Sequence, residues 1–409
     1  MEIIKKVYQI LISKKIFSDP EKKELLIYDE SIYRHGYESF FDEDSCFVFE
    51  TRYKRLYILL YIKAILKKIL FFSKEHIFQL YTIEIIKIVN PKYIISFSHY
   101  ILIFWDLKRY FKNIIFIICQ HHISLGYDGK HELNPIAAAK KRYKEKKKID
   151  HIFLWGKTMI DGFKECLEGN FYQSGSIKNN IYKNIKSENK KDLLYMSQYQ
   201  VVGDMKMPIE NGTFISRYKY FNARKKVLDI LYEYCLDKKL NLVIAPRAFI
   251  KEKLEEEKKH YEKILDKKNF NFLNRSRRFQ TYEEVFSNYK YFVVIDCSTG
   301  YEAMARGKRV AHLNVVYDLN KISGGKNNRF GWPGDFKLKG PFWTNTATKS
   351  EIFRCLDFIF QTDDESWKEI KKNYIDPIIL YDEENKIFKG HLKKIGLKLK
   401  QKIIVHNNE

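Results

Sequence analysis

The sequence predicts an α/β protein built from two Rossmann-like, doubly wound domains. Short runs rich in β-branched and aromatic residues alternate with longer helical runs along most of the 409 residues, a pattern typical of parallel strands joined by helices. The run Ile114–Ile118 is continuously apolar, as expected of a strand buried on both faces. A polar stretch at 183–191 has no apolar periodicity and is interpreted as a surface linker between two such series.

The first series, residues 1–185, fits one doubly wound sheet. Its expected strands are 25–28, 46–49, 93–97, 113–119 and 151–155, and its expected helices are 56–72, 77–88, 101–111, 135–147 and 158–167.

The second series, residues 186–380, repeats this architecture. Its expected strands are 193–197, 242–245, 270–273, 292–296 and 309–313, and its expected helices are 214–236, 251–265, 282–287 and 299–306. Ligands of open parallel sheets bind outside the carboxyl ends of the strands. The loops there are therefore expected to face a central cleft between the halves. Residues 381–409 are expected to form a basic C-terminal helix.

Composition narrows the class of protein. The chain carries a formal charge of +23 at pH 7, and its 16% aromatic content excludes disorder as the main state. Its six cysteines include no CxxC pair, which gives no support to a zinc knuckle.

The N-terminus lacks the features of a signal peptide, so a cytoplasmic protein is expected. The apolar stretch 56–72 is interrupted by lysines, so we expect it to lie on an anionic membrane surface at most and not to span it.

The most informative motif is residues 291–310, which predicts a buried strand, a tight turn and a short helix. Ser298, Thr299 and Gly300 stand at the helix N-terminus, where backbone N–H groups and the helix dipole favour a phosphate. The alternative is that Ser298 only caps the helix. Glu302, one turn further on, is expected to accept hydrogen bonds from ribose hydroxyls. Otherwise it is a solvated carboxylate of the first turn.

A resemblance to a known family rests on a few segments: Asp296-Cys-Ser-Thr-Gly-Tyr-Glu-Ala-Met-Ala-Arg-Gly-Lys308, Phe330-Gly-Trp-Pro333, Gly340-Pro-Phe-Trp343, Phe153-Leu-Trp-Gly156 and Gly175-Ser-Ile-Lys-Asn-Asn180. They resemble bacterial surface-carbohydrate glycosyltransferases of the two-domain GT-B type. Within that class the chain is most similar to the retaining β-Kdo transferases of lipopolysaccharide O-antigen and capsule assembly, Kdo being 3-deoxy-D-manno-oct-2-ulosonic acid. The resemblance spans about residues 90–345, and its specific part is 292–343.

The resemblance implies a CMP-activated donor sugar bound mainly by the C-terminal half and a glycan acceptor bound mainly by the N-terminal half. It implies no obligatory metal and no cofactor besides the donor substrate. Related enzymes that use CMP-sialic acid carry a His-Pro pair, whereas the nearest counterpart here is Ala245-Pro246-Arg247. This difference leaves open whether the sugar has eight or nine carbons.

A CMP-ulosonate donor carries a phosphate and a carboxylate, so its site needs cationic groups. Arg247 follows the expected strand 242–245, and a guanidinium binds either anion in bidentate fashion. An ordinary surface arginine is the alternative. Arg275, Arg277 and Arg278 are weaker candidates.

Retention by a covalent route needs a carboxylate nucleophile. Asp204 and Glu210 lie in the loop after the first strand of the second half, which makes Asp204 the first candidate and Glu210 the second. Either could instead be an ordinary loop or capping carboxylate. Asp296 is a further competitor.

His121 and His122 follow the most apolar strand, and either could deprotonate the acceptor hydroxyl. A metal site here is disfavoured because no ligand spacing fixes three donors on one face. Trp332, in a glycine-rich segment, either lines the donor pocket or fills the core between the domains.

Two other functions stay open at this stage. One is a GT-B transferase that uses a UDP-sugar. The other is a nucleic-acid-binding protein, which the charge alone would suit, although lysines are spread along the whole chain and no nucleic-acid-binding motif is present. The Kdo-transferase hypothesis predicts three partners: a nucleotide-sugar donor, a glycan or lipid-linked glycan acceptor, and the inner membrane surface. It predicts no nucleic acid.

Overall fold

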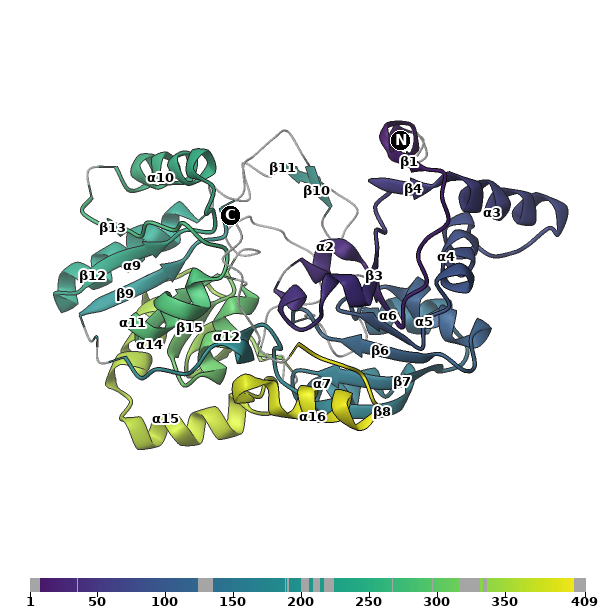
Figure 1. Ribbon diagram of the computed structural model, residues 1–409. Coiled ribbons are helices and arrows are strands. Elements are labelled where there is room, and N and C mark those ends of the chain that lie inside the picture. Colours follow the sequence, from purple (N-terminus) through teal and green to yellow (C-terminus); the bar gives the residue numbers. More distant parts are fainter. Residues whose placement is uncertain are drawn as a thin grey trace.

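The computed structural model consists of two parallel α/β domains, the first drawn in purple to blue and the second in green (Figure 1). It describes residues 8–34, 36–123, 135–187, 189, 191–199, 206–208, 214–216, 224–266, 268–295, 297–315, 332–333 and 337–400. The predicted fold class, two Rossmann-like doubly wound domains of the GT-B type, is confirmed.

Within the described residues, the first domain contains a six-stranded parallel sheet. Its strands, in spatial order, are β3 (Cys46–Phe49), β2 (Leu25–Tyr28), β5 (Tyr93–Ser96), β6 (Ile115–Cys119), β7 (Lys147–Leu154) and β8 (Leu167–Gln173). The chain runs outward from β2 to β3, then returns to β5 and continues the other way. The strand order therefore reverses between β2 and β5, the point where sheets of this kind bind ligands.

Helices and short turns of helix connect these strands. They are α2 (Glu30–Tyr33), η1 (Tyr37–Ser39), η2 (Glu43–Ser45), α3 (Ile58–Leu70), α4 (Ile77–Val89), α5 (Leu102–Leu107), η3 (Lys108–Tyr110), α6 (Pro135–Arg142), α7 (Lys157–Phe163) and η4 (Asn179–Ile181). Two short parallel strands, β1 (Lys14–Ile16) and β4 (Arg55–Tyr57), pair beside this sheet.

Within the described residues, the second domain contains a seven-stranded sheet. Its strands, in spatial order, are β13 (Asn271–Phe272), β12 (Asn241–Ala245), β9 (Asp192–Met196), β14 (Tyr291–Val294), β15 (Arg309–Leu313), β17 (Trp343–Thr344) and β16 (Lys339–Gly340). All pairs are parallel except β16 with β17. Here the strand order reverses between β9 and β14.

The remaining elements belong to the second half of the chain. They are the antiparallel pair β10 (Lys206–Pro208) and β11 (Phe214–Ser216), and the helices α9 (Lys225–Lys238), α10 (Lys251–Leu265), η5 (Thr281–Val285), α11 (Phe286–Asn288), α12 (Ser298–Ala305), α14 (Lys349–Gln361), α15 (Asp364–Ile370), η6 (Lys371–Ile375), η7 (Glu383–Asn385) and α16 (Lys386–Lys394). Strand β11 stands where the sequence predicted the start of a helix at 214. That prediction was wrong because the apolar periodicity of α9 begins only at Val227.

Strand β8 was not predicted. It lies at the edge of the first sheet and pairs only with β7, and most of its residues are exposed or half-buried. An edge strand of this kind lacks the apolar run or alternation by which strands are found in a sequence.

The C-terminal segment completes the first domain, although the sequence suggested a separate basic helix. Successive residues of β2 face two cores: Leu26 faces one, and Ile27 faces the other together with Phe388 and Leu392 of α16. Figure 1 shows α16, in yellow, beneath β8 and α7. The Leu380 amide donates to the Trp155 carbonyl (2.9 Å). The second face of the first sheet is thus buried by residues from the far end of the chain.

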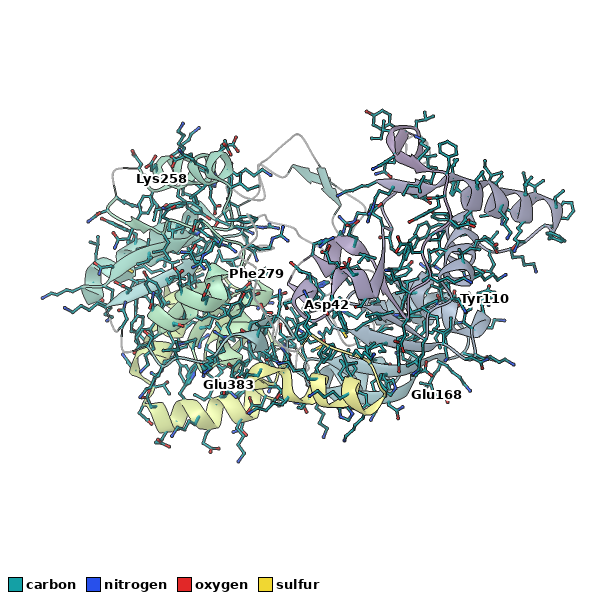
Figure 2. All side chains as sticks on the ribbon, viewed as in Figure 1. Asp42, Tyr110, Glu168, Lys258, Phe279 and Glu383 are labelled. Atoms are coloured by element: carbon teal, nitrogen blue, oxygen red, sulfur yellow. The ribbon has the colours of Figure 1, made fainter. Side chains whose placement is uncertain are left out.

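An aromatic ring also packs across the boundary between the two domains. Phe279 of the second domain, labelled in Figure 2, lies against Gly36 of the first, where an added Cβ would be 3.0 Å from its ring. Among the described residues, no helix combines the length and the apolarity that crossing a bilayer requires.

We expect Gly156→Ala to lower the free energy of unfolding by about 1–3 kcal/mol, because a Cβ there has no room. It would stand 2.3 Å from the carbonyl carbon of Ile378 and 2.4 Å from the Pro377 oxygen, and so would separate the returning C-terminal segment from the first domain. Urea unfolding measures the effect. Gly390 of α16 is the control, since nothing lies within 4 Å of a Cβ added there. Equal losses in the two variants would contradict the packing argument.

Candidate functional site

The turn between β14 and α12 lies at the reversal point of the second sheet and is partly open to solvent. Cys297 is the N-cap residue and makes no side-chain capping bond, so Ser298 is the first helical residue and not the cap. Ser298 and Thr299 are both half-exposed. In the described part of the chain neither hydroxyl has a hydrogen-bond partner. The two hydroxyls expected to hold a phosphate are therefore accessible, whereas the Gly300 amide donates to the Cys297 carbonyl at 3.1 Å.

Gly300 holds α12 close to the sheet. A Cβ at this position would stand 2.7 Å from a methyl carbon of Val294 on β14 and 2.9 Å from Cε1 of His312 on β15. Helix and strands can approach this closely only without a side chain at residue 300. The position of the Ser298–Thr299 turn thus depends on a glycine inside the helix.

Glu302 is not placed where the sequence suggested. Its side chain has no exposure to solvent. One carboxylate oxygen accepts a hydrogen bond from the Ser176 hydroxyl and lies 3.5 Å from the Lys178 ammonium, and the other accepts one from the Tyr282 hydroxyl at 2.7 Å. The expected role in binding ribose hydroxyls does not fit a carboxylate whose two oxygens are already engaged and shielded from solvent.

Arg306, one turn after Glu302, binds both the first-domain segment 176–182 and η5 of its own domain. Its guanidinium donates to the carbonyls of Tyr282 (2.7 Å), Asn179 (3.1 Å) and Tyr182. Glu302 on α12 and its C-cap residue Arg306 are one turn apart, so together they clamp the segment 176–182 that follows β8. The sequence contained both motifs, but it did not show that they touch.

Arg247 lies at the carboxyl end of β12, as predicted, and its side chain is exposed. Its backbone is held by Glu257 of α10, whose carboxylate accepts the amides of Arg247 (3.0 Å) and Ala248 (2.8 Å) and the Ser197 hydroxyl. Burial raises the pKa of Glu257. Glu257 was missed, although its spacing from Leu254 and Tyr261 places it on the apolar face of an otherwise charged helix.

Arg275 stabilises the same loops. It donates to the carbonyls of Pro246 (3.2 Å), Arg247 (2.8 Å) and Arg278, and burial lowers its pKa. A pocket of about 190 Å³ lies next to it at the carboxyl ends of β12 and β13. Pro246, Asn274, Gln280 and Thr281 are among the residues that line this pocket.

Trp332 belongs to the core of the second domain. It is 2% exposed, its indole N–H donates to the Tyr374 carbonyl at 3.1 Å, and its ring packs against Tyr301, Phe342 and Trp343. A ring enclosed on these sides is not available to a sugar or a base, so the prediction that it lines the donor pocket does not fit its environment.

His121 and His122 stand at the carboxyl end of β6, where the first domain meets the second. The Tyr37 hydroxyl lies 3.1 Å from Nδ1 of His121. Burial, with a smaller contribution from the positive charge of Lys178, lowers the pKa of His122 to about 4. Burial also lowers the pKa of the neighbouring His99. Because Lys178 also faces Glu302, the structure brings the predicted histidines and the α12 clamp together.

The two candidate nucleophiles, Asp204 and Glu210, lie outside the described residues, as does the competing Asp296. The strand that leads toward the first of them, β9, lies directly between β12 and β14. The loop after β9 therefore leaves the sheet between Arg247 and the Ser298–Thr299 turn.

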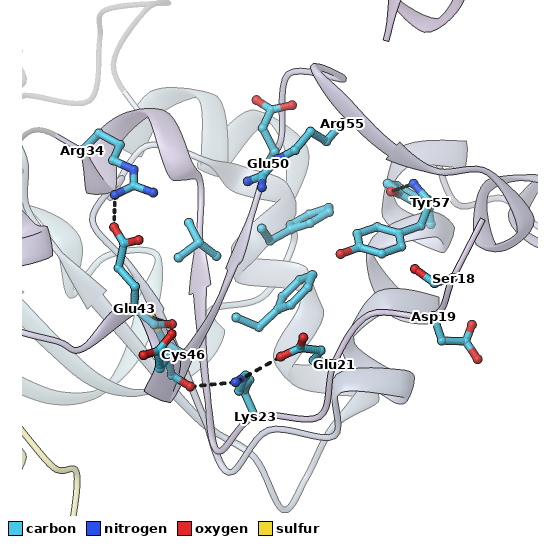
Figure 3. Close-up of a pocket in the computed structure, with 15 residues that line it drawn as sticks. Ser18, Asp19, Glu21, Lys23, Arg34, Glu43, Cys46, Glu50, Arg55 and Tyr57 are labelled. Carbon is cyan, nitrogen blue, oxygen red and sulfur yellow. Dashed lines mark hydrogen bonds and ion pairs between the residues drawn. The ribbon is translucent and has the colours of Figure 1, made fainter. Parts of the chain in front are cut away.

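A second pocket, of about 350 Å³, runs along β3 in the first domain (Figure 3). Its lining includes the aromatic rings of Phe47, Phe49, Tyr57 and Tyr81. Two ion pairs join lining residues, Arg34 with Glu43 and Lys23 with Glu21.

This pocket extends from the domain boundary to the base of α3. At one end the Arg34 carbonyl accepts a hydrogen bond of 2.8 Å from Arg278 of the second domain. At the other end is Tyr57, the residue before α3.

Two doubly wound domains, with an accessible strand-turn-helix corner at the reversal point of the second sheet, define a two-domain Rossmann-like protein of the GT-B type. The chain belongs to the family described as putative O-antigen biosynthesis protein, whose model matches residues 126–396. The predicted link to O-antigen biosynthesis is thereby confirmed.

Several solved structures are similar over most of this chain. The wall teichoic acid polymerase TagF has a TM-score of 0.46 at 12% identity, covering 92% of this chain and 89% of its own. The UDP-GlcNAc 2-epimerase of Methanocaldococcus jannaschii has a TM-score of 0.46 at 9% identity, with 91% and 99% covered. MnaA of S. aureus, solved with UDP, has a TM-score of 0.48 at 11% identity, with 92% and 98% covered. No curated protein sequence matches the chain.

We expect Glu302→Ala to lower the free energy of unfolding by about 3–5 kcal/mol. The variant removes the carboxylate of a buried network, so Lys178, Ser176 and Tyr282 lose the group to which they bind. Denaturant unfolding of the full chain measures this. Ser298→Ala, four residues earlier on the same helix, removes a half-exposed hydroxyl and should change stability by less than about 0.5 kcal/mol. If Glu302→Ala unfolds like the parent protein but no longer binds nucleotide, Glu302 belongs to the ribose site after all.

Proposed function

We propose that this protein is a glycosyltransferase that transfers Kdo, or a related acidic sugar, from a CMP-activated donor to a glycan acceptor during O-antigen biosynthesis. Family membership supports the pathway. The observation that carries the enzymatic proposal is the accessible Ser298–Thr299 turn at the reversal point of the second sheet, because parallel sheets bind nucleotides there and a helix N-terminus favours phosphate.

In this proposal the donor lies across the carboxyl ends of β12, β9 and β14. Adjacent strands are about 4.8 Å apart, so the ends of β12 and β14 are separated by about 10 Å, which suits a nucleotide with its sugar. The Ser298–Thr299 turn takes the phosphate, and the exposed Arg247 pairs with the phosphate or the sugar carboxylate. The pocket beside Arg275 accommodates the base.

We propose that the reaction retains configuration by the covalent route, which takes two displacements. The Asp204 carboxylate attacks the anomeric carbon, the bond from that carbon to the phosphate oxygen breaks, and CMP leaves with the electron pair. The acceptor hydroxyl then attacks the same carbon, the bond to Asp204 breaks, and a base takes the hydroxyl proton. Glu210 is the second candidate for the nucleophile.

His121 is the better candidate for that base. With a pKa of about 4, the neighbouring His122 is a weak base at neutral pH. The hydrogen bond between His121 and Tyr37 fixes the orientation of the His121 ring. His122 then contributes by packing against His121 and His99.

The acceptor glycan is placed in the first domain. The pocket along β3 supports this, since aromatic rings and paired charged groups are the side chains that contact sugar faces and hydroxyls. It also reaches the domain boundary at Arg34, from which an acceptor hydroxyl can approach the donor.

We expect CMP to raise the melting temperature of the purified protein more than UDP does, because the proposed donor is a CMP-sugar and ligand that binds only the folded state stabilises it. Arg247→Ala should reduce this protection, whereas Lys251→Ala, a change of exposed charge at the start of α10, should not. Protection by UDP alone would instead indicate a UDP-sugar transferase. Tight binding of short DNA that resists added salt would indicate a nucleic-acid-binding protein.

We expect mass spectrometry of protein incubated with CMP-Kdo to show an adduct of one sugar, because the first displacement leaves the sugar on a carboxylate. Asp204→Ala should abolish both adduct and transfer while CMP protection persists. Glu210→Ala, which removes the second candidate, should keep both adduct and transfer, and their loss in that variant alone would move the role to Glu210. An Asp204→Ala protein that still transfers sugar would remove Asp204 from the mechanism.

A further inference from the structure

Helix α3 is apolar on two opposite faces. Leu60, Tyr61 and Ala64 are buried in the first domain. On the other side, five apolar side chains are each at least 46% exposed: Leu59, Ile62, Leu66, Ile69 and Leu70. At 100° per residue these five fall within one narrow arc of the helix. An apolar helix face normally packs against a neighbouring element, yet α3 leaves this one in contact with water.

The end of α3 extends this face with two aromatic rings. Phe71 is 74% exposed and Phe72 is 89% exposed. The turn that carries them is held by Lys68, whose ammonium donates to the carbonyls of Ser73 and Glu75. Phe72 has a φ of 46°, a left-handed conformation that is costly for a bulky side chain. The structure thus holds both rings outward at a cost in backbone strain.

The N-terminal segment adds a second group of exposed apolar side chains. They are Tyr8, Leu11, Ile12 and Phe17, each more than 60% exposed. This segment contains β1, which pairs with β4, and β4 leads directly into α3. Figure 1 shows β1 of this segment and α3 at the same corner of the first domain, away from the second domain, and Figure 2 shows side chains projecting outward there. We call the exposed apolar residues of the two segments the α3 surface.

The charge beside the α3 surface is positive. Lys63, Lys67 and Lys87 lie within 2.8, 2.6 and 3.5 Å of the oxygens of a single carboxylate, that of Glu84. Three ammonium groups around one carboxylate leave an excess of positive charge at the edge of the apolar face. Lys74, just beyond Phe72, is exposed as well.

This combination identifies the partner. An apolar helix face flanked by lysines is complementary to an anionic lipid surface, where apolar groups enter the acyl boundary and lysines meet headgroup phosphates. A second copy of the chain would oppose the same positive charges and be repelled. We propose that the α3 surface docks the protein on an anionic phospholipid bilayer, with α3 lying in the plane of the interface. The pocket along β3, which ends at Tyr57 beside α3, would then open near the membrane.

Docking on the bilayer requires only the α3 surface, whereas the place it gives to a lipid-linked acceptor rests on the proposed function. The test is sedimentation of the full chain with vesicles of equal parts phosphatidylcholine and phosphatidylglycerol, and with vesicles of phosphatidylcholine only. We expect binding to the anionic vesicles that weakens with added salt and is much poorer without phosphatidylglycerol.

The double variant Phe71→Ser, Phe72→Ser should weaken vesicle binding by about tenfold or more, because it removes two large apolar groups that would leave water. The control, Leu236→Ser with Leu338→Ser, removes two apolar side chains exposed elsewhere, at 62% and 47%, and should bind as the parent does.

Equal binding by the two double variants, or no binding by the parent, would overturn the proposal. So would a parent dimer in light scattering that the Phe71→Ser, Phe72→Ser variant converts to monomer, since a second copy would then be the occupant. Nucleotide protection should be unchanged in both variants, so failure here is distinguishable from failure of the proposed function.

Discussion

A carboxylate with no access to water joins the two domains of this protein. Glu302, on the helix that opens with the Ser298–Thr299 turn, receives hydrogen bonds from Ser176 of the first domain and Tyr282 of the second. A buried carboxylate is tolerated only when its oxygens are satisfied, so any movement that separates the domains must break this network or move it as one piece. The position of the proposed phosphate-binding turn is therefore tied to the segment 176–182 and, through it, to the first sheet.

The same segment depends on the end of the chain. Asn180 and Asn385 are hydrogen-bonded to each other (3.1 Å), and Asn385 also donates to the Ile177 carbonyl (2.8 Å). Since α16 further supplies Phe388 and Leu392 to the second core of the first domain, residues 377–400 serve as a structural strap between the domains. The Ser298–Thr299 turn, the segment 176–182 and the returning C-terminus therefore depend on one another. The α3 surface, which we propose faces lipid, lies at the far corner of the first domain.

Much of the architecture was predictable because it is local. Strands such as β2 and β15 and helix α10 appear where their apolar patterns placed them. The motif at 291–310 also formed the strand, turn and helix expected, since glycine and the short polar residues favour such a turn. In the proposed site, the same reasoning predicted that Arg247 follows one strand and that His121 and His122 follow another. Strand β8, at an exposed edge, had no pattern to find.

The sequence by itself determined the alternation of strands and helices, the turn at Ser298 and the apolar character of residues 56–72, because these depend on neighbours along the chain. Only the tertiary structure decided that Glu302 and Trp332 are buried, that the C-terminal helix belongs to the first domain, and that one face of α3 stays uncovered. The physical reason is the same in each case: burial depends on which distant segments pack together. A carboxylate four residues from a half-exposed serine becomes a domain-joining group only because Ser176, Lys178 and Tyr282 surround it.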